Sequence, residues 1–294
     1  MNTQTMNGQA VEQPVTTWRH VTHVLKGNKL STVALFFLLA LLVLAVLAPV
    51  VVPHDPYATH LDRALQAPDG VHWFGTDRVG RDVFSRVLTA ARLDLTIALS
   101  AVLLSFVFGT LIGGAAAYFG GRWDRIIGRA TDVLMIFPLF VIAMAFVAAF
   151  GNSLGSIVLA SAIVNVPYFL RLARSEVKQL RLQSYVEAAR AGGNSEMRVL
   201  LEFMLPNTLP TMSVQLSTSL GWAILNVASL SFIGLGIHPP TAEWGIMVAE
   251  GAANLLAGNW WLVVFPGAAL TLTVLSFNLL GDGVRDMLDV RTRK

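Results

Sequence analysis

The chain has 294 residues, of which 54% are hydrophobic and 13% are charged, and its mean hydropathy is +0.62. Soluble domains average about 25% charged residues, so this composition excludes an ordinary soluble protein and indicates a polytopic membrane protein. The net charge of +3 comes from basic residues scattered between apolar runs, which does not indicate nucleic-acid binding, and the absence of cysteine excludes disulfides, zinc–thiolate sites and thiol nucleophiles.

Six uncharged apolar runs are long enough, at roughly 20 residues, to cross a bilayer as helices. The first follows a basic segment and so also fits a signal peptide, but its length, its final prolines (Pro49 and Pro53) and the lack of a clear small-x-small cleavage site favour a transmembrane helix. We therefore expect an all-α polytopic membrane protein with an N-terminal tail at 1–30 and one transmembrane domain at 31–294. The expected spans are 33–52, 95–119, 133–150, 154–170, 209–237 and 260–280.

The distribution of basic residues predicts which side of the membrane each loop occupies. Six spans place both termini on one side, and if that side is cytoplasmic, all but five of the 21 lysines and arginines lie there. Because cytoplasmic loops carry the excess of Lys and Arg, we expect cytoplasmic N and C termini and a cytoplasmic segment 181–207. The five exceptions share one outer loop, where aspartates offset them: Arg63, Arg78, Arg81, Arg86 and Arg92.

The first outer loop, 54–92, ends in an apolar stripe at helical spacing. The stripe predicts a helix that lies along the outer membrane interface and leads into the second span, with Asp82 and Arg86 paired at i, i+4. His72 lies near several acids but has no partner histidine at helical or hairpin spacing, so we expect a solvated loop histidine and no metal site. The stripe consists of Phe84, Val87, Leu88 and Ala91, and a similar one in the last outer loop consists of Trp244, Met247, Val248 and Gly251.

Two features of the spans indicate how the helices contact one another and the membrane surface. Gly109 and Gly113 have the GxxxG spacing that permits a close helix crossing. Asp132, at the start of the third span, could belong to a conduction path, but we expect it to pair with a neighbouring arginine at the level of the lipid headgroups.

Hydroxyl and amide side chains recur along the fifth span. An uncharged polar lining suits a path for peptide-like solutes, because backbone amides need hydrogen-bond partners without tight charge trapping. We assign Gln215, Ser219 and Asn226 to such a path, while hydrogen bonds between helices would account for about half of the whole set. The set is Thr211, Ser213, Gln215, Ser217, Thr218, Ser219, Asn226, Ser229 and Ser231.

Segment 181–207 carries two short amphipathic helical patterns joined at a glycine. The first has mostly small residues at i, i+3, i+4 and i+7, which let another backbone or side chain approach closely. Gly193 and Asn194 break the pattern, Asn194 or Ser195 can cap a second helix, and Pro206 ends it. Such a bent pair suits a coupling device between a membrane domain and a partner in the aqueous phase. The first stripe is Tyr185, Ala188, Ala189 and Gly192, and the second is Met197, Leu200, Leu201 and Met204.

This segment resembles the EAA loop of bacterial ABC importer permeases. The match consists of Glu187-Ala188-Ala189, then Gly193, then Leu205-Pro206. It departs from the pattern at Phe203, where peptide-type members often have histidine or another polar residue, which implies different packing of the second helix. Three more motifs resemble the second membrane subunit of dipeptide, oligopeptide and nickel importers: GTD-x-x-GRD-V-x-SR at 75–86, PPT-x-EWG at 239–245 and FNLLGDGVRDMLD at 277–289.

The resemblance implies the transmembrane-domain fold of a type I ABC importer in the bacterial inner membrane. The implied partners are a second, homologous permease subunit, two ATP-binding subunits, a periplasmic or lipid-anchored solute-binding protein and membrane lipid. The chain lacks the phosphate-binding sequence GxxxxGK[ST], so we expect no cofactor and no catalytic residue in it, with ATP and Mg²⁺ bound by partner subunits. The resemblance assigns coupling to the ATP-binding subunits to Tyr185, Glu187, Ala188, Ala189, Gly193, Leu205 and Pro206.

We therefore expect a permease subunit that forms half of a translocation path for peptides, the commonest solutes of this branch. A nickel chelate, glutathione or another small solute stays open, because the soluble binding protein largely selects the solute. An intramembrane enzyme would need a catalytic arrangement such as His-Glu-x-x-His, which is absent. A secondary carrier usually has more spans or visible repeats with buried ion-coupling acids. Stable co-purification with ATP-binding chains separates the importer from both alternatives.

Overall fold

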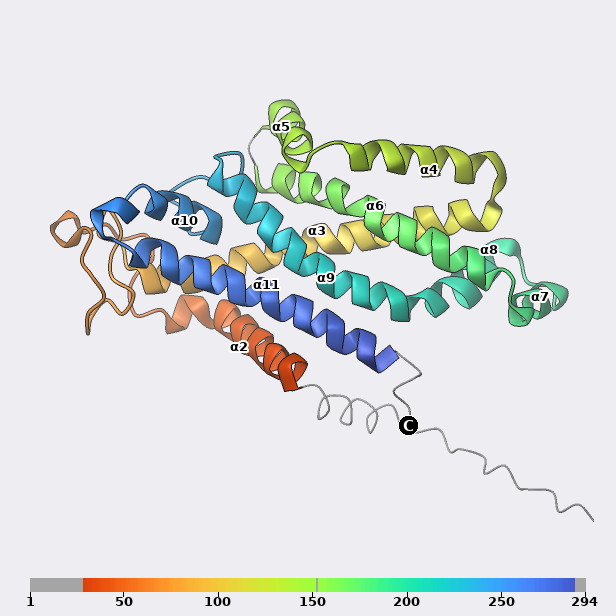
Figure 1. The fold of residues 1–294 in the computed structure, drawn as a ribbon, viewed down its shortest axis with the longest axis horizontal. Coiled ribbons are helices and arrows are strands. Elements are labelled where there is room, and N and C mark those ends of the chain that lie inside the picture. Colours follow the sequence, from red (N-terminus) through yellow and green to blue (C-terminus); the bar gives the residue numbers. More distant parts are fainter. Residues whose placement is uncertain (1–28, 152, 289–294) are drawn as a thin grey trace, which may run out of the picture.

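The computed structural model describes residues 29–151 and 153–288, and within them the chain is helical with no strand. The expected tail at 1–30 lies almost wholly outside the described residues, as does the last residue of the motif at 277–289. The long helices run side by side along the longest axis of the molecule (Figure 1). They are α2 (Lys29–Val51), α3 (Val83–Phe119), α4 (Gly121–Ile136), α6 (Leu154–Leu180), α9 (Leu205–Phe232) and α11 (Trp261–Leu288). The shorter α5 (Leu139–Phe150), between α4 and α6, is turned away from this axis.

The shorter helices gather at the two ends of this bundle (Figure 1). At one end lie the loop 52–82, with its 3-10 turn η1 (Leu61–Arg63), and α10 (Trp244–Ala252), which η3 (Leu255–Ala257) follows. At the other end lie α7 (Ser184–Ala191), α8 (Glu196–Arg198) and the π-helical turn η2 (Val199–Met204). The segment expected in the cytoplasm and the loops expected outside are therefore at opposite ends of the bundle.

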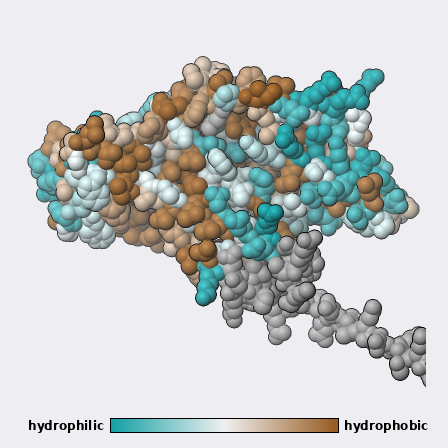
Figure 2. All heavy atoms as spheres, viewed as in Figure 1, coloured by the Kyte–Doolittle hydropathy of each residue, from teal (hydrophilic) through white to brown (hydrophobic). Residues whose placement is uncertain are grey.

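The prediction of a polytopic membrane protein is confirmed, although not in every span. Among the described residues α2, α3, α6 and α11 are long and apolar enough to cross a membrane, and the bent pair of α4 and α5 adds a fifth span if the two form one. The remaining expected span, the fifth at 209–237, corresponds to α9, which is 28 residues long but less apolar because of its hydroxyl and amide side chains. Figure 2 shows hydrophobic residues over the central part of the molecule and hydrophilic residues gathered mainly at the α7 end.

The expected span at 133–150 is not one continuous helix. α4 ends at Ile136, and α5, which begins after Pro138, is bent from it by 96°. The residue before a proline is forced out of the helical region, and Phe137 has the extended values φ −74° and ψ 129°. At 1.5 Å per residue the 12 residues of α5 reach about 18 Å, which is short of the roughly 30 Å hydrocarbon core.

The GxxxG pair is the crossing point of α3 and α6. A Cβ atom on Gly109 would lie 2.7 Å from the Cβ of Phe169, and one on Gly113 would lie 2.9 Å from the Cα of Leu170. Both distances are shorter than real contacts, so the two helices approach as closely as they do only because these positions carry no side chain. The predicted close crossing is confirmed.

The largest hydrophobic core lies between α3, α9, α10 and α11. Trp244 is fully buried in it and donates from its indole nitrogen to the carbonyl oxygen of Val87 at 3.0 Å. Trp261 donates in the same way to the carbonyl oxygen of Thr76 at 3.2 Å. The stripe expected in α10 is confirmed, since Trp244, Met247 and Gly251 are buried. The helix expected before the second span is present, but it is not a separate helix along the membrane interface, because α3 continues it into the span without a break.

Candidate functional site: the elbow and the polar cavity

The predicted elbow is present between α7 and α8. The N–H of Gly193 donates to the carbonyl oxygen of Arg190 at 3.0 Å, and that of Asn194 donates to the carbonyl oxygen of Ala189 at 3.4 Å, which together form a Schellman motif at the end of α7. This motif requires a left-handed residue, and Gly193 has φ +81°. Ser195 then caps α8 by accepting a hydrogen bond from the N–H of Arg198. Nothing lies within 4 Å of a Cβ built on Gly193, so glycine is needed there for its backbone conformation.

The second helix does not end at Pro206. α8, η2 and α9 follow one another without a break, and Pro206 lies in the first turn of α9, where proline has no intrahelical N–H bond to lose. The predicted apolar stripe is only partly correct, because Leu200 and Met204 are buried whereas Met197 and Leu201 are exposed. The π-helical turn changes the residue spacing, so that Val199 faces the core in their place.

One face of α7 is held by a hydrophobic cluster and the other is free. Val186 and Ala189 are buried, whereas Tyr185, Glu187 and Ala188 are exposed. The predicted small-residue stripe is therefore divided between an anchoring face and an open face. Phe203 packs against the same cluster. The cluster's buried members are Ala117, Tyr118, Val177, Val186, Ala189, Val199, Leu200, Met204 and Leu205.

Polar contacts also tie the elbow to the end of α3. The hydroxyl of Tyr118 donates to the carboxylate of Glu196, and the guanidinium of Arg190 lies 5.2 Å from the centre of the Tyr118 ring and 3.4 Å from Glu196. Arg181 donates to the carbonyl oxygen of Ala117 at 3.0 Å. The hydrogen bond from Tyr118, together with the charge of Arg190, lowers the pKa of the Glu196 carboxyl, so this acid is charged at neutral pH. The elbow is thus fixed on one side and open to the water phase on the other.

The three predicted path residues line one cavity. Gln215, Ser219 and Asn226, one face of α9, border a cavity of about 490 Å³ whose other walls come from α4, α5 and α6. The side-chain nitrogen of Gln215 donates to the hydroxyl of Ser219 at 3.1 Å. Sequence reasoning missed Asn165 and Tyr168 on the opposite wall, although Asn165 is the only amide in the apolar run 154–170. The complete lining is Leu134, Met135, Phe137, Ile142, Val164, Asn165, Tyr168, Gln215, Thr218, Ser219, Trp222 and Asn226.

Several other hydroxyl groups of α9 are used within the helix bundle. Ser213 and Ser229 donate to carbonyl oxygens of their own helix at 2.6 and 2.7 Å. Ser217 donates to the carbonyl oxygen of Phe277 in α11 at 2.9 Å. Hydrogen bonding between helices, the alternative considered for this set, therefore accounts for Ser217, whereas Ser213 and Ser229 are satisfied within α9 itself.

The outer loop departs from two predictions. Asp82 does not pair with Arg86: its carboxylate caps α3 by accepting from the N–H of Ser85 at 2.8 Å and lies 2.9 Å from Nδ1 of His72. Arg86 instead donates to the carbonyl oxygens of Pro56 and Pro240, both at 3.2 Å. His72 is 5% exposed, so the prediction of a solvated histidine is wrong. The i, i+4 rule failed because Asp82 stands at the N-cap, where backbone donors compete for its oxygens.

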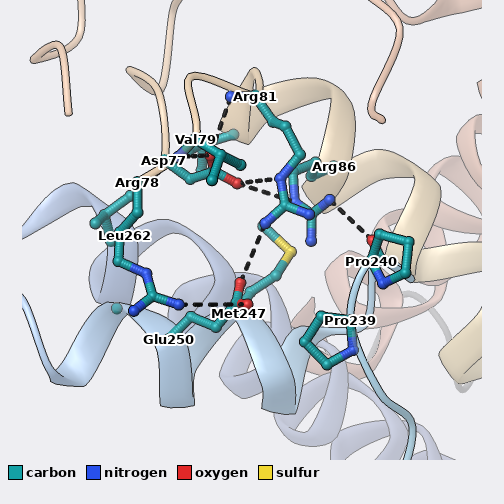
Figure 3. A pocket seen from close by; sticks show the side chains of 12 residues that line it. Asp77, Arg78, Val79, Arg81, Arg86, Pro239, Pro240, Met247, Glu250 and Leu262 are labelled. Carbon is teal, nitrogen blue, oxygen red and sulfur yellow. Dashed lines mark hydrogen bonds and ion pairs between the residues drawn. The ribbon is translucent and has the colours of Figure 1, made fainter. Parts of the chain in front are cut away.

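Ion pairs connect this loop to α10 around a cavity of about 200 Å³ (Figure 3). Arg81 lies 2.5 Å from the carboxylate of Asp77 and 3.4 Å from that of Glu250, and Arg78 approaches Glu250 at 3.8 Å. Two of the outer arginines, Arg81 and Arg86, are thus buried beside acids, since Arg86 lies 3.7 Å from Asp77.

Salt bridges also join α4 to α6, where the pairing predicted for Asp132 is confirmed by a 3.1 Å contact with Arg171.

Glu243, in the motif at 239–245, is buried where α10 begins. Its carboxylate accepts hydrogen bonds from the N–H groups of Gly245 and Ile246 at 2.9 and 2.8 Å, so it caps the helix. Burial nevertheless raises the pKa of the Glu243 carboxyl. This motif therefore has a structural role in setting α10 against α3.

Comparisons with known proteins identify relatives over nearly the whole length. A family described as binding-protein-dependent transport system inner membrane component matches residues 105–294, and the N-terminal transmembrane domain of oligopeptide transport permease C matches residues 16–68. The probable D,D-dipeptide transport system permease protein of Escherichia coli (strain K12) is 43% identical over 266 residues, 90% of this chain and 89% of that protein. A dipeptide transport system permease of Alkalihalophilus pseudofirmus is 41% identical (95% and 91% covered), and a glutathione transport system permease of Escherichia coli O6:K15:H31 is 40% identical (96% and 93% covered).

Proposed function

This chain belongs to the family of binding-protein-dependent transport system inner membrane components, and we propose that it forms half of the translocation path of an importer that carries peptides or similar amide-bearing solutes. It is a multi-pass permease subunit and a transport component. We further propose that ATP is hydrolysed by two separate subunits, which couple to this chain through the segment 181–207, defined here as the coupling loop.

The observation that carries this proposal is the exposed face of α7. Tyr185, Glu187 and Ala188 point away from the bundle, while Val186 and Ala189 hold the same helix on the hydrophobic cluster. A helix fixed on one side transmits a push from a partner on the other side to the elements beneath it. Those elements are the ends of α3 and α6 and the start of α9, all of which lead back through the bundle. Gly193 sets the angle of the elbow, and Leu205 with Pro206 continues the elbow into α9.

The polar cavity supports the proposed class of solute. Amide and hydroxyl groups of Gln215, Ser219, Asn226 and Asn165 can each donate or accept hydrogen bonds, as a peptide backbone requires. Trp222 and Tyr168 add apolar area, and none of the residues that line the cavity carries a formal charge. Such a lining binds amides weakly enough to release them. The D,D-dipeptide, dipeptide and glutathione permeases among the relatives support the same class, with glutathione or a nickel chelate as alternative cargo.

We propose an inner-membrane orientation with both termini in the cytoplasm. The start of α2 and the end of α11 face the side of the bundle on which α7 lies (Figure 1). The basic residues Arg174, Lys178 and Arg181 lie on the same side. In this orientation the loop 52–82 and α10 face a periplasmic or lipid-anchored binding protein, and a second homologous permease completes the path.

The test is retention of the ATP-binding subunits by substituted permeases. Glu187→Lys and Ala188→Trp alter the open face of α7 without entering the cluster below, so we expect retention to fall at least about tenfold and transport to fall with it. Asp62→Lys provides a matched charge reversal for the retention measurement, because Asp62 is exposed at the other end of the bundle and should leave binding of the ATP-binding subunits unchanged. Normal retention and transport in both α7 variants would refute the coupling role. Failure of any ATP-binding chain to co-purify with the wild type would refute the importer itself.

A further inference from the structure

Two histidines and an aspartate meet in the loop 52–82 end of the bundle. One potential ligand atom from each of His54, His72 and Asp82 lies within 4.8 Å of the other two. The centres of the two imidazole rings are 4.8 Å apart, with the ring planes inclined by 41°. These side chains line a cavity of about 290 Å³. The established transport role does not use them.

The hydrogen bonds determine which ring nitrogens are available. The Asp82 carboxylate is already accepting from Ser85 and can only accept from a histidine, so Nδ1 of His72 is the donor in their 2.9 Å contact. Nε2 of His72 is then the free nitrogen, and it is buried with no hydrogen-bond partner among the residues that the structure describes. In the same way Nε2 of His54 donates to the carbonyl oxygen of Val71 at 3.1 Å, which leaves Nδ1 free.

We propose that His72 and His54 bind a divalent transition-metal ion, with Asp82 as the carboxylate that orients His72. Metal-binding histidines nearly always donate their second ring N–H to a carboxylate or a backbone carbonyl, and both histidines here do so. Imidazole nitrogen suits zinc, copper, nickel and iron. A buried, unpartnered Nε2 costs free energy, and a metal ion relieves that cost. Water in the cavity completes the coordination.

The surroundings set the charge and the mechanical effect of such an ion. Asp82 and Asp55 supply negative charge to the cavity wall, and Arg63 supplies one positive charge. His54 lies three residues beyond the end of α2 at Val51, and Asp82 caps the start of α3, with His72 between them in sequence. A shared ion therefore fastens the end of α2 to the start of α3. His54 is half-buried and lines the same cavity as His72.

The experiment measures Zn²⁺ uptake by the intact transporter. The complex is purified through an affinity tag without histidine, stripped with a chelator and titrated with Zn²⁺ in a calorimeter. We expect the wild type to bind one more Zn²⁺ per permease than His72→Gln or His54→Gln. Asp82→Asn keeps a good N-cap residue and should weaken the same binding event by about 10- to 100-fold. His60→Gln is the matched control, because His60 is an exposed histidine on the same cavity, and it should bind as the wild type does.

Zinc-edge X-ray absorption provides the second measurement. The bound ion should show imidazole ligands in the wild type and in His60→Gln, and fewer of them in Asp82→Asn at sub-saturating Zn²⁺. If His72→Gln fails to assemble, Asp82→Asn and His54→Gln carry the comparison. Equal uptake by the wild type and these two variants would overturn the proposal and leave the His72–Asp82 contact as a support for the N-cap alone. This outcome is independent of whether the coupling loop binds an ATPase.

Discussion

The conformation of Gly193 yields a prediction that separates backbone strain from crowding at a docking surface. Its φ of +81° lies in the left-handed region, and a Cβ atom there meets nothing within 4 Å. The cost of Gly193→Ala is therefore the left-handed penalty alone, about 1–2 kcal/mol, and Gly193→Asn should cost less because asparagine tolerates that region. Since 1.4 kcal/mol is a factor of ten, the population of the elbow conformation, and with it the affinity for the ATP-binding subunits, should fall by about fivefold to thirtyfold in the alanine variant.

The neighbouring glycine provides the control. Gly192 has φ −73°, and a Cβ there would lie 3.4 Å from its nearest neighbour, the carbonyl oxygen of Ala188, so Gly192→Ala should bind almost as the wild type does. The assay is surface-immobilised permease in nanodiscs, with purified ATP-binding subunits in solution. The expected order of affinity is wild type and Gly192→Ala, then Gly193→Asn, then Gly193→Ala. If asparagine, the larger side chain, weakens binding more than alanine does, the partner is sensing size at this position and the argument from φ is refuted.

Two further predictions concern the bundle and the cavity. Gly113→Ala forces a Cβ against the backbone of Leu170 and should lower the free energy of unfolding by about 1–3 kcal/mol, measured by SDS unfolding followed by circular dichroism. The control, Gly267→Ala, lies in open space on α11 and should be neutral or stabilising by about 0.5–1 kcal/mol. Equal unfolding midpoints for the two variants would contradict the close crossing. Asn226→Leu should raise the KM for dipeptide uptake by about threefold to tenfold, which corresponds to the loss of one hydrogen bond. Ser229→Ala should leave the KM unchanged, because the hydroxyl of Ser229 bonds to its own helix. An unchanged KM in both variants would remove α9 from the path.

Periodicity predicted those features of the fold that depend on neighbouring residues in the chain. The elbow at Gly193, the α10 stripe and the crossing at Gly109 and Gly113 follow from local spacing, and all three are present. The sequence could not indicate that α6 is the partner in that crossing, because any helix with a suitable surface satisfies GxxxG. Pro138 indicates a break in the third span, because the residue before a proline is forced out of the helical region. The break was missed because the average hydropathy of the run is barely changed by a single proline.

The errors in the outer loop have a common cause. His72 and Asp82 are ten residues apart with no helical or hairpin relation, and Arg86 bonds to Pro240, 154 residues away. Spacing rules apply within one element, whereas these contacts form between segments that the fold brings together. Asn165 escaped notice for the same reason, since its relation to the polar face of α9 exists only in three dimensions.

α3 is the element that can carry work from the proposed docking surface across the membrane. Its last residues, Ala117 and Tyr118, belong to the cluster beneath the elbow, and its first turns, at Val83 and Val87, pack in the core with α10 and α11. Interactions that couple distant sites pass through rigid elements and packed side chains, and 37 residues of unbroken helix span about 55 Å. Gly114 tightens the connection, because a Cβ there would lie 2.7 Å from the side chain of Leu205, the residue that opens α9. A displacement at the elbow must therefore move α3 and α9 together, and α9 carries one wall of the polar cavity.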